Sequence, residues 1–146
     1  MLSSQLTRSV AFQLMREAGW APFAVLVFHA IVVRTPYRAA LDNMNHFLGG
    51  AAIAFFLLHG MRLALPNRLS SRTSNFFAFS LACTVAVFWE IAEFAGDQLF
   101  GKHVQISLPE TMWDLIFGIL GAAITLSLLA ILHKLRSGIH RDQPPR

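Results

Sequence analysis

The feature that most constrains the fold of this chain is a succession of four apolar runs with few charges in them. Residues 76–95 and 112–132 are long enough to cross a bilayer, because a spanning helix needs about 20 mostly apolar residues. Residues 44–65 also qualify on length. Residues 20–35 form a weaker run, which spans only if its helix continues toward Thr35 or the bilayer is thinned.

The composition indicates the same class of protein. With 55% apolar and only 14% charged residues in 146 positions, the chain is too apolar for an ordinary soluble domain of its size. The single cysteine, Cys83, lies in an apolar run, so no intrachain disulfide can form and we expect a small buried hydrophobic side chain there. The sequence therefore predicts an all-α fold, an integral membrane four-helix bundle over residues 20–133.

Two short segments flank this predicted bundle. In residues 1–19, apolar side chains such as Phe12 alternate with charged ones such as Arg16, which is typical of a short amphipathic helix in the membrane interface. We expect no cleaved signal peptide, because the first apolar run begins late and no small-residue cleavage motif precedes the next span. Residues 134–146 are predicted to form a basic cytoplasmic tail with a disordered end.

The positions of the basic residues predict the orientation. If four helices span and the N-terminus is inside, the inner side carries nine of the 12 Lys and Arg residues: Arg8, Arg16, Arg62, Arg68, Arg72, Lys134, Arg136, Arg141 and Arg146. The positive-inside rule then favours a multi-pass protein with both termini in the cytoplasm. This topology accounts for the net charge of +4, so we expect the lipid bilayer and no nucleic acid as a partner.

Five ionisable residues lie in or at the edge of the apolar runs. They are Asp42, His46, Glu90, Glu93 and Asp114. The predicted topology brings them to the outer end of the bundle, and spacings of i, i+4 and i, i+3 place the paired residues on one face of each helix. Ionisable residues inside spanning segments are costly and mark functional sites by default. We therefore expect one site near the outer membrane face.

The residue types favour a metal ion at this site. Several carboxylates in a partly dehydrated space cannot all stay ionised without a compensating cation. Carboxylates with an imidazole on neighbouring helices resemble the metal sites built inside four-helix bundles. We predict His46, Glu90, Glu93 and Asp114 as metal ligands and Asp42 as a catalytic base or an orienting group for His46. Such a donor set suits Mg, Mn, Fe or Zn without choosing among them.

Each of these residues also has a structural interpretation. Asp42 could pair with Arg38 at the same helix end, and His46 could form a hydrogen bond between helices. Asp114 lies in the first turn of its predicted helix, where the helix dipole favours a carboxylate. Glu90 and Glu93, one turn apart inside a span, have the weakest structural alternative.

Three further ionisable residues are expected to lie outside the site. Asp97 fits a solvated position at a helix end, and His29 fits a packed or hydrogen-bonded role in the first helix. His59 belongs to the inner half of its predicted span and is the least suited to a functional role.

A resemblance to known proteins rests on three motifs on successive spans. They are Asp42-x-x-x-His46-Phe47-x-x-Gly50, Trp89-Glu90-x-x-Glu93, and Asp114 followed by Gly121-Ala122. The chain resembles the YjdF-like family of small bacterial inner-membrane proteins, and more loosely the VanZ-like proteins, which share only the Asp-x-x-x-His start of the first motif. The resemblance implies a location in the bacterial inner membrane. It also implies that members are usually longer, with additional N-terminal spans, but it implies no reaction.

Two classes of function remain open. The first is a metal-dependent hydrolase or transferase acting at the periplasmic face on a lipid or lipid-linked substrate. The second is a non-enzymatic proton- or cation-handling transporter or an accessory membrane subunit. Serine-hydrolase, nucleotide-binding and zincin motifs do not occur. The oligomeric state is also open, because the glycines could mark contacts within the chain or a dimer face: Gly49, Gly50, Gly118 and Gly121.

Overall fold

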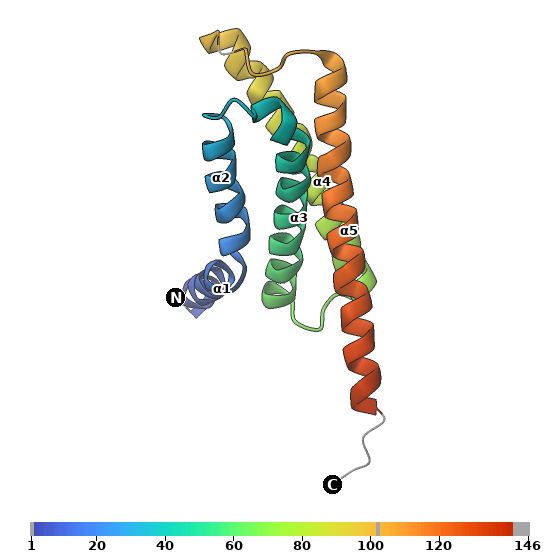
Figure 1. Ribbon diagram of the computed structural model, residues 1–146. Helices are drawn as coiled ribbons and strands as arrows, with labels where there is room; N and C mark the ends of the chain where they lie inside the picture. Colours follow the sequence, from blue (N-terminus) through green and yellow to red (C-terminus); the bar gives the residue numbers. More distant parts are fainter. Residues whose placement is uncertain (1, 102, 142–146) are drawn as a thin grey trace.

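The chain folds into five helices in the computed structural model, which describes residues 2–101 and 103–141. They are α1 (Leu2–Ala18), α2 (Trp20–Val32), α3 (Arg38–Ala64), α4 (Ser71–Phe100) and α5 (Leu108–Arg141) (Figure 1). No strand occurs within these described ranges. The all-α prediction is therefore confirmed.

Three of the helices are long and apolar enough to cross a membrane. These candidate spans, by length and composition, are Arg38–Ala64, Ser71–Phe100 and Leu108–Ser137. Helix α2 has 13 residues and ends at Val32, where the Thr35 N–H donates to the Val32 carbonyl oxygen at 2.9 Å in a tight turn. The helix does not reach Thr35. Three of the four predicted spans therefore qualify by length and composition, α2 is a shorter apolar helix, and the four-helix membrane bundle is not confirmed.

The helices extend beyond the predicted apolar runs, because polar turns continue them past the hydrophobic part. The Ser70 hydroxyl caps α4 by accepting from the Thr73 N–H at 3.1 Å, so this helix begins well before residue 76. Gly101, with a φ of 61°, ends it in the left-handed conformation that favours glycine. Helix α5 continues to Arg141 through much of the predicted tail, and residues 142–146 lie outside the described residues.

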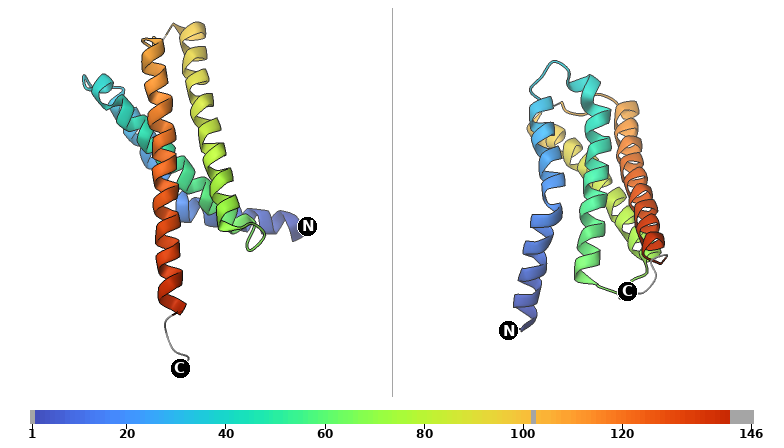
Figure 2. Two further views of the ribbon diagram at one scale, coloured as in Figure 1. Left: turned by 90° about the vertical axis from the view of Figure 1, so that its right-hand side faces the viewer. Right: turned by 60° about the horizontal axis from the view of Figure 1, so that its bottom comes forward.

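The helices alternate in direction along the chain. Helices α3 and α5 run parallel to each other, and α2 and α4 run the opposite way (Figure 1). Helix α1 lies across the direction of α5 rather than along it (Figure 2, left). The α2–α3 turn and the α4–α5 loop therefore meet at one end of the molecule, opposite the end from which α1 and the last turns of α5 project.

Small side chains form the core between the candidate spans. Its buried members are Ala54, Leu58, Ala78, Ala82, Ala122 and Leu126. Large apolar side chains point outward instead, as Phe76 does with 66% exposure and Ile131 with 56%. Small residues inside and large apolar residues outside are the pattern of helices that pack together in lipid.

Glycines bring α3 and α5 into backbone contact. A Cβ added at Gly50 would overlap the carbonyl oxygen of Gly118, and one added at Gly121 would overlap that of Phe47. His46 and Asp114 each lie one helical turn before Gly50 and Gly118 on these parallel helices. The close approach therefore places His46 beside Asp114. It also shows that these glycines serve contacts within the chain.

Candidate functional site

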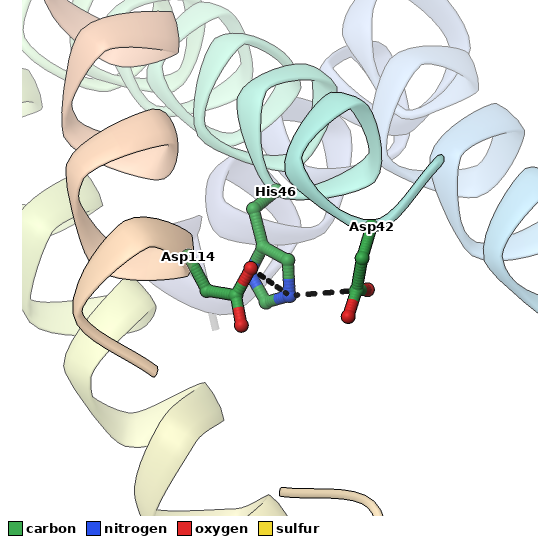
Figure 3. Close-up of side chains that lie close together, drawn as sticks. All are labelled: Asp42, His46 and Asp114. Carbon is green, nitrogen blue, oxygen red and sulfur yellow. Dashed lines mark ion pairs between the residues drawn. The ribbon is translucent and has the colours of Figure 1, made fainter. Parts of the chain in front are cut away.

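His46 lies at the centre of the acidic cluster near the loop end of the bundle. Its Nε2 atom is 3.7 Å from Asp42 Oδ1 and 3.7 Å from Asp114 Oδ1. Figure 3 shows the two carboxylates approaching this one ring nitrogen from opposite sides. The other nitrogen, Nδ1, is 3.5 Å from Glu90 Oε1. One imidazole thus faces carboxylates from three different helices.

These distances are longer than hydrogen bonds, which are about 2.7–3.2 Å for N–H donors. Only 7% of the Glu90 side chain and 6% of the Asp114 side chain are exposed. Glu90 Oε1 and Asp114 Oδ1 are buried and have no hydrogen-bond partner among the described residues. Because buried polar atoms are almost always satisfied, both oxygens call for a further donor or a cation.

The cluster forms two triads that share the imidazole. Asp42, His46 and Asp114 make up the first, and His46, Glu90 and Glu93 the second, with potential ligand atoms within 4.8 Å of one another in each. The structure thus brings together all five predicted site residues. A single metal ion binds only one nitrogen of an imidazole ring. Asp114 faces Nε2 and Glu90 faces Nδ1, so these two acids cannot both be ligands of one ion that His46 binds.

Glu93 differs from Glu90 in having a partner of its own. The indole Nε1–H of Trp89 donates to Glu93 Oε1 at 2.8 Å, across one turn of α4. The Trp89 ring also meets His29 edge to face, with ring centroids 5.4 Å apart. Trp89 therefore holds Glu93 and connects α4 with α2.

The α4–α5 loop covers the other side of Glu90. The Gln105 side chain donates to the Glu90 carbonyl oxygen at 3.0 Å and to Glu90 Oε2 at 3.3 Å. Asp97 fixes this loop by accepting from the backbone N–H groups of Val104 and Gln105 at 2.7 and 2.8 Å. Arg38 donates to the Val104 carbonyl oxygen at 2.8 Å. Asp97 and Arg38 thus position Gln105 against Glu90, and Asp97 is more than a solvated residue at a helix end.

Two residues of this region escaped the sequence reasoning. Gln105 lies in a loop, where no periodicity marks it. Asn45 did carry a signal, an amide directly before His46 in an apolar helix. It is only 5% exposed, and its Nδ2 atom lies 2.9 Å from His29 Nδ1. The Asn45 Oδ1 atom is buried without a hydrogen-bond partner among the described residues.

His59 stands apart from this cluster, toward the other end of α3. Its Nε2 atom lies 2.8 Å from Glu17 Oε2 and fixes α1 to α3. The hydrogen bond with His59 is the main reason why the pKa of the Glu17 carboxyl is below its ordinary value of 4.5. This geometry agrees with a structural role for His59.

An apolar cavity of about 220 Å³ adjoins the cluster. Helices α2, α3 and α4 provide most of its walls, and His46 lies at its boundary. Residues on α3 and α4 that line it include Gly49, Ala82 and Ala86, whose small side chains leave the space between the helices open.

Comparisons with known proteins give a family but no reaction. Residues 2–135 match the family described as "Predicted membrane protein (DUF2238)". A protein of Thermotoga maritima described as "Uncharacterized protein" is 31% identical over 100 residues, which cover 66% of this chain and 50% of that protein. The match thus spans about half the length of this curated relative. No solved structure matches the chain.

Proposed function

This chain belongs to the DUF2238 family of predicted membrane proteins. For this membrane protein we propose that a divalent metal ion binds at His46. The observation that carries the proposal is the pair of buried, unpartnered carboxylate oxygens, Glu90 Oε1 and Asp114 Oδ1, on either side of the His46 ring. Buried carboxylates without hydrogen bonds are costly unless they are protonated or bound to a cation.

The geometry favours a division of roles within the cluster. Asp42, His46 through Nε2, and Asp114 provide the ligand atoms. Glu90 Oε1 lies 3.5 Å from Nδ1, and a shortening of this distance on metal binding would let Nδ1–H donate to it, which would fix the tautomer that leaves Nε2 free for the metal. This assignment changes three predicted roles, since Asp42 becomes a ligand, Glu90 becomes a positioning residue and Glu93 is no longer a ligand. Glu93, held by Trp89, lies next to the metal ligands rather than among them.

The function that such a site supports best is a metal-dependent hydrolase or transferase acting on a lipid or lipid-linked substrate. One imidazole with carboxylate oxygens suits Mg, Mn, Fe or Zn. An ion of this kind polarises a phosphoryl or carbonyl oxygen or activates water. The apolar cavity beside His46 agrees with a substrate that comes from the membrane.

The distribution of basic residues supports the proposed location. The YjdF-like resemblance is consistent with the DUF2238 match and implies the bacterial inner membrane. If α2 crosses the bilayer together with the three candidate spans, both termini lie in the cytoplasm, and the end that carries the α2–α3 turn and the α4–α5 loop faces the periplasm. We accordingly assign the His46 cluster to the periplasmic side and α1 to the cytoplasmic interface.

Elemental analysis of the full chain, purified from membranes without chelator, tests the metal proposal. We expect stoichiometric divalent metal in the wild type, strong loss in Asp114→Asn, and no loss in the control His59→Ala. Absence of metal from the wild-type protein would overturn the proposal. Proton or cation flux in liposomes that contain this metal-free protein would then favour the transporter alternative.

A further inference from the structure

The cavity beside His46 has one polar end and one apolar end. Its polar side chains are His29, Asn45, His46 and Trp89, each from the part of its helix nearest the loop end. Along the same three helices, the lining then becomes wholly apolar toward Pro22, Ile53 and Ala82. This gradient matches an elongated ligand with one polar terminus.

The cavity lies between two helices that do not pack on each other. Among the described residues, no Cα atom of α2 lies within 8 Å of one in α4. The edge-to-face contact of His29 with Trp89 closes the space at the polar end only. Farther from the loop end than this contact, the small side chains of Ala82 and Ala86 leave the space between α2 and α4 unfilled. In a membrane, this separation faces lipid chains rather than water.

Asn45, at the polar end of the cavity, carries a hydrogen-bond acceptor that has no partner among the described residues. Asn45 lines the cavity and is 95% buried, given its exposure of 5%. Its amide nitrogen is occupied by His29, whereas Oδ1 has no partner among the described residues. A buried amide oxygen costs free energy unless a donor reaches it. A hydroxyl or an amide N–H of a ligand would supply that donor.

We propose that this cavity binds a single hydrocarbon chain of a membrane lipid, which enters between α2 and α4 and donates a hydrogen bond from its polar end to Asn45. The volume of about 220 Å³ exceeds the roughly 150 Å³ that admits a benzene-sized apolar ligand, and the apolar walls exclude sugars and nucleotides. The bound polar end lies beside His46. That this lipid is the substrate rests on the metal-dependent function proposed above, whereas its binding does not.

Photolabelling of the full chain in nanodiscs tests the proposal. The probe is a long-chain primary alcohol with a diazirine in its chain, and the comparison probe is its methyl ether, which lacks the hydrogen-bond donor. We expect the alcohol to label cavity residues such as Leu26 and Val85. The methyl ether should bind about fivefold more weakly, the effect of one neutral hydrogen bond.

Two variants with a matched control sharpen this test. Gly49→Leu fills the cavity, because among the described residues a Cβ at Gly49 meets only a Val25 methyl group, at 4.0 Å, and labelling of the cavity should be lost. Gly96→Leu is the control, since a Cβ at Gly96 has no neighbour within 4 Å in the described part of the chain, and it should label like the wild type. Asn45→Leu keeps the side-chain size and should abolish the preference for the alcohol over the ether.

The outcomes separate this inference from the metal proposal. Cavity labelling that persists in protein shown to contain no metal supports the inference while the metal proposal fails. Metal-containing protein in which both probes label only the outer surface overturns the inference and leaves the metal proposal intact. Equal labelling by alcohol and ether in the wild type overturns the role of Asn45, even if the variants fail to fold.

Discussion

Two histidines on the same helix have opposite surroundings. His59 forms one hydrogen bond of 2.8 Å with one carboxylate, Glu17, and both side chains are about one third exposed. His46 faces Asp42, Glu90 and Asp114 at 3.5–3.7 Å, and only 10% of its side chain is exposed. In the first pair, the imidazole and the carboxylate satisfy each other with one hydrogen bond. In the second group, three carboxylates surround one imidazole, and the distances from their oxygens to the ring nitrogens are too long for hydrogen bonds.

The difference shows what marks a functional group in a membrane helix. A histidine with a carboxylate is not informative by itself, since His59 has one and serves to hold α1. An excess of buried carboxylates over their hydrogen-bond donors is informative, because each buried oxygen without a donor needs a proton or a cation. This excess occurs around His46.

Removal of the His46 imidazole should have the largest effect. We expect the metal affinity of His46→Ala to fall by more than roughly 100-fold, the largest decrease expected when a residue that only positions a metal ligand is mutated. His59→Ala should keep its metal, because among the described residues the His59 ring pairs with one carboxylate only, that of Glu17. Equal metal binding by both variants, measured by titration of metal-free protein, would remove the distinction between the two histidines.

Separation of α3 from α5 should have the second-largest effect on metal binding. A side chain at Gly50 must displace the backbone of Gly118, so Gly50→Val should move His46 away from Asp114. We expect strong loss of metal and a decrease of about 1–3 kcal/mol in the free energy of unfolding. Gly96→Val is the control, because a Cβ there meets nothing within 4 Å in residues 2–101 and 103–141. Thermal unfolding in detergent with metal analysis measures both effects, and metal retained by Gly50→Val would contradict this account.

Glu90→Gln should have a smaller effect on the same site. If Glu90 positions the ring of His46 through Nδ1, metal affinity should fall by about 10–100-fold while binding persists. Glu93→Gln should change it less, since Glu93 is already paired with Trp89. A complete loss of metal in Glu90→Gln would instead make Glu90 a direct ligand, as the sequence predicted.

The smallest effect is expected at the Glu17–His59 contact. The pKa of Glu17 is below its ordinary value of 4.5, so the contact stabilises the fold above that pH and is lost as the pH falls through the lowered pKa. Release of α1 in acid, followed by hydrogen exchange, should therefore be detectable in the wild type. Glu17→Gln should remove this pH dependence, and a wild-type profile in the variant would argue against the contact.

Much of this site follows from the sequence because helical spacing and charge asymmetry are local rules. The i, i+4 spacing of Asp42 and His46 places them on one face, and the Lys and Arg distribution brings the acids of three helices to one end. The glycines near His46 and Asp114 also indicated close helix packing. These rules predict proximity, and the structure agrees with it.

The finer features depend on three-dimensional contacts that no local rule encodes. The side of the His46 ring that each acid faces follows from the register of α3 against α4 and α5. The role of Gln105 follows from a loop that Asp97 and Arg38 hold in place. Apolar runs also locate the hydrocarbon part of a helix rather than its ends, so they missed both the early end of α2 and the long extension of α5.

X-ray absorption at the metal edge tests the central claim most directly, because it reports the ligand shell of the bound ion. For the full chain loaded with zinc, this account predicts a ligand shell of one imidazole nitrogen together with carboxylate oxygens. The imidazole signal should be lost in His46→Ala and retained in His59→Ala. An all-oxygen shell in the wild type, or an imidazole signal that survives His46→Ala, would contradict it.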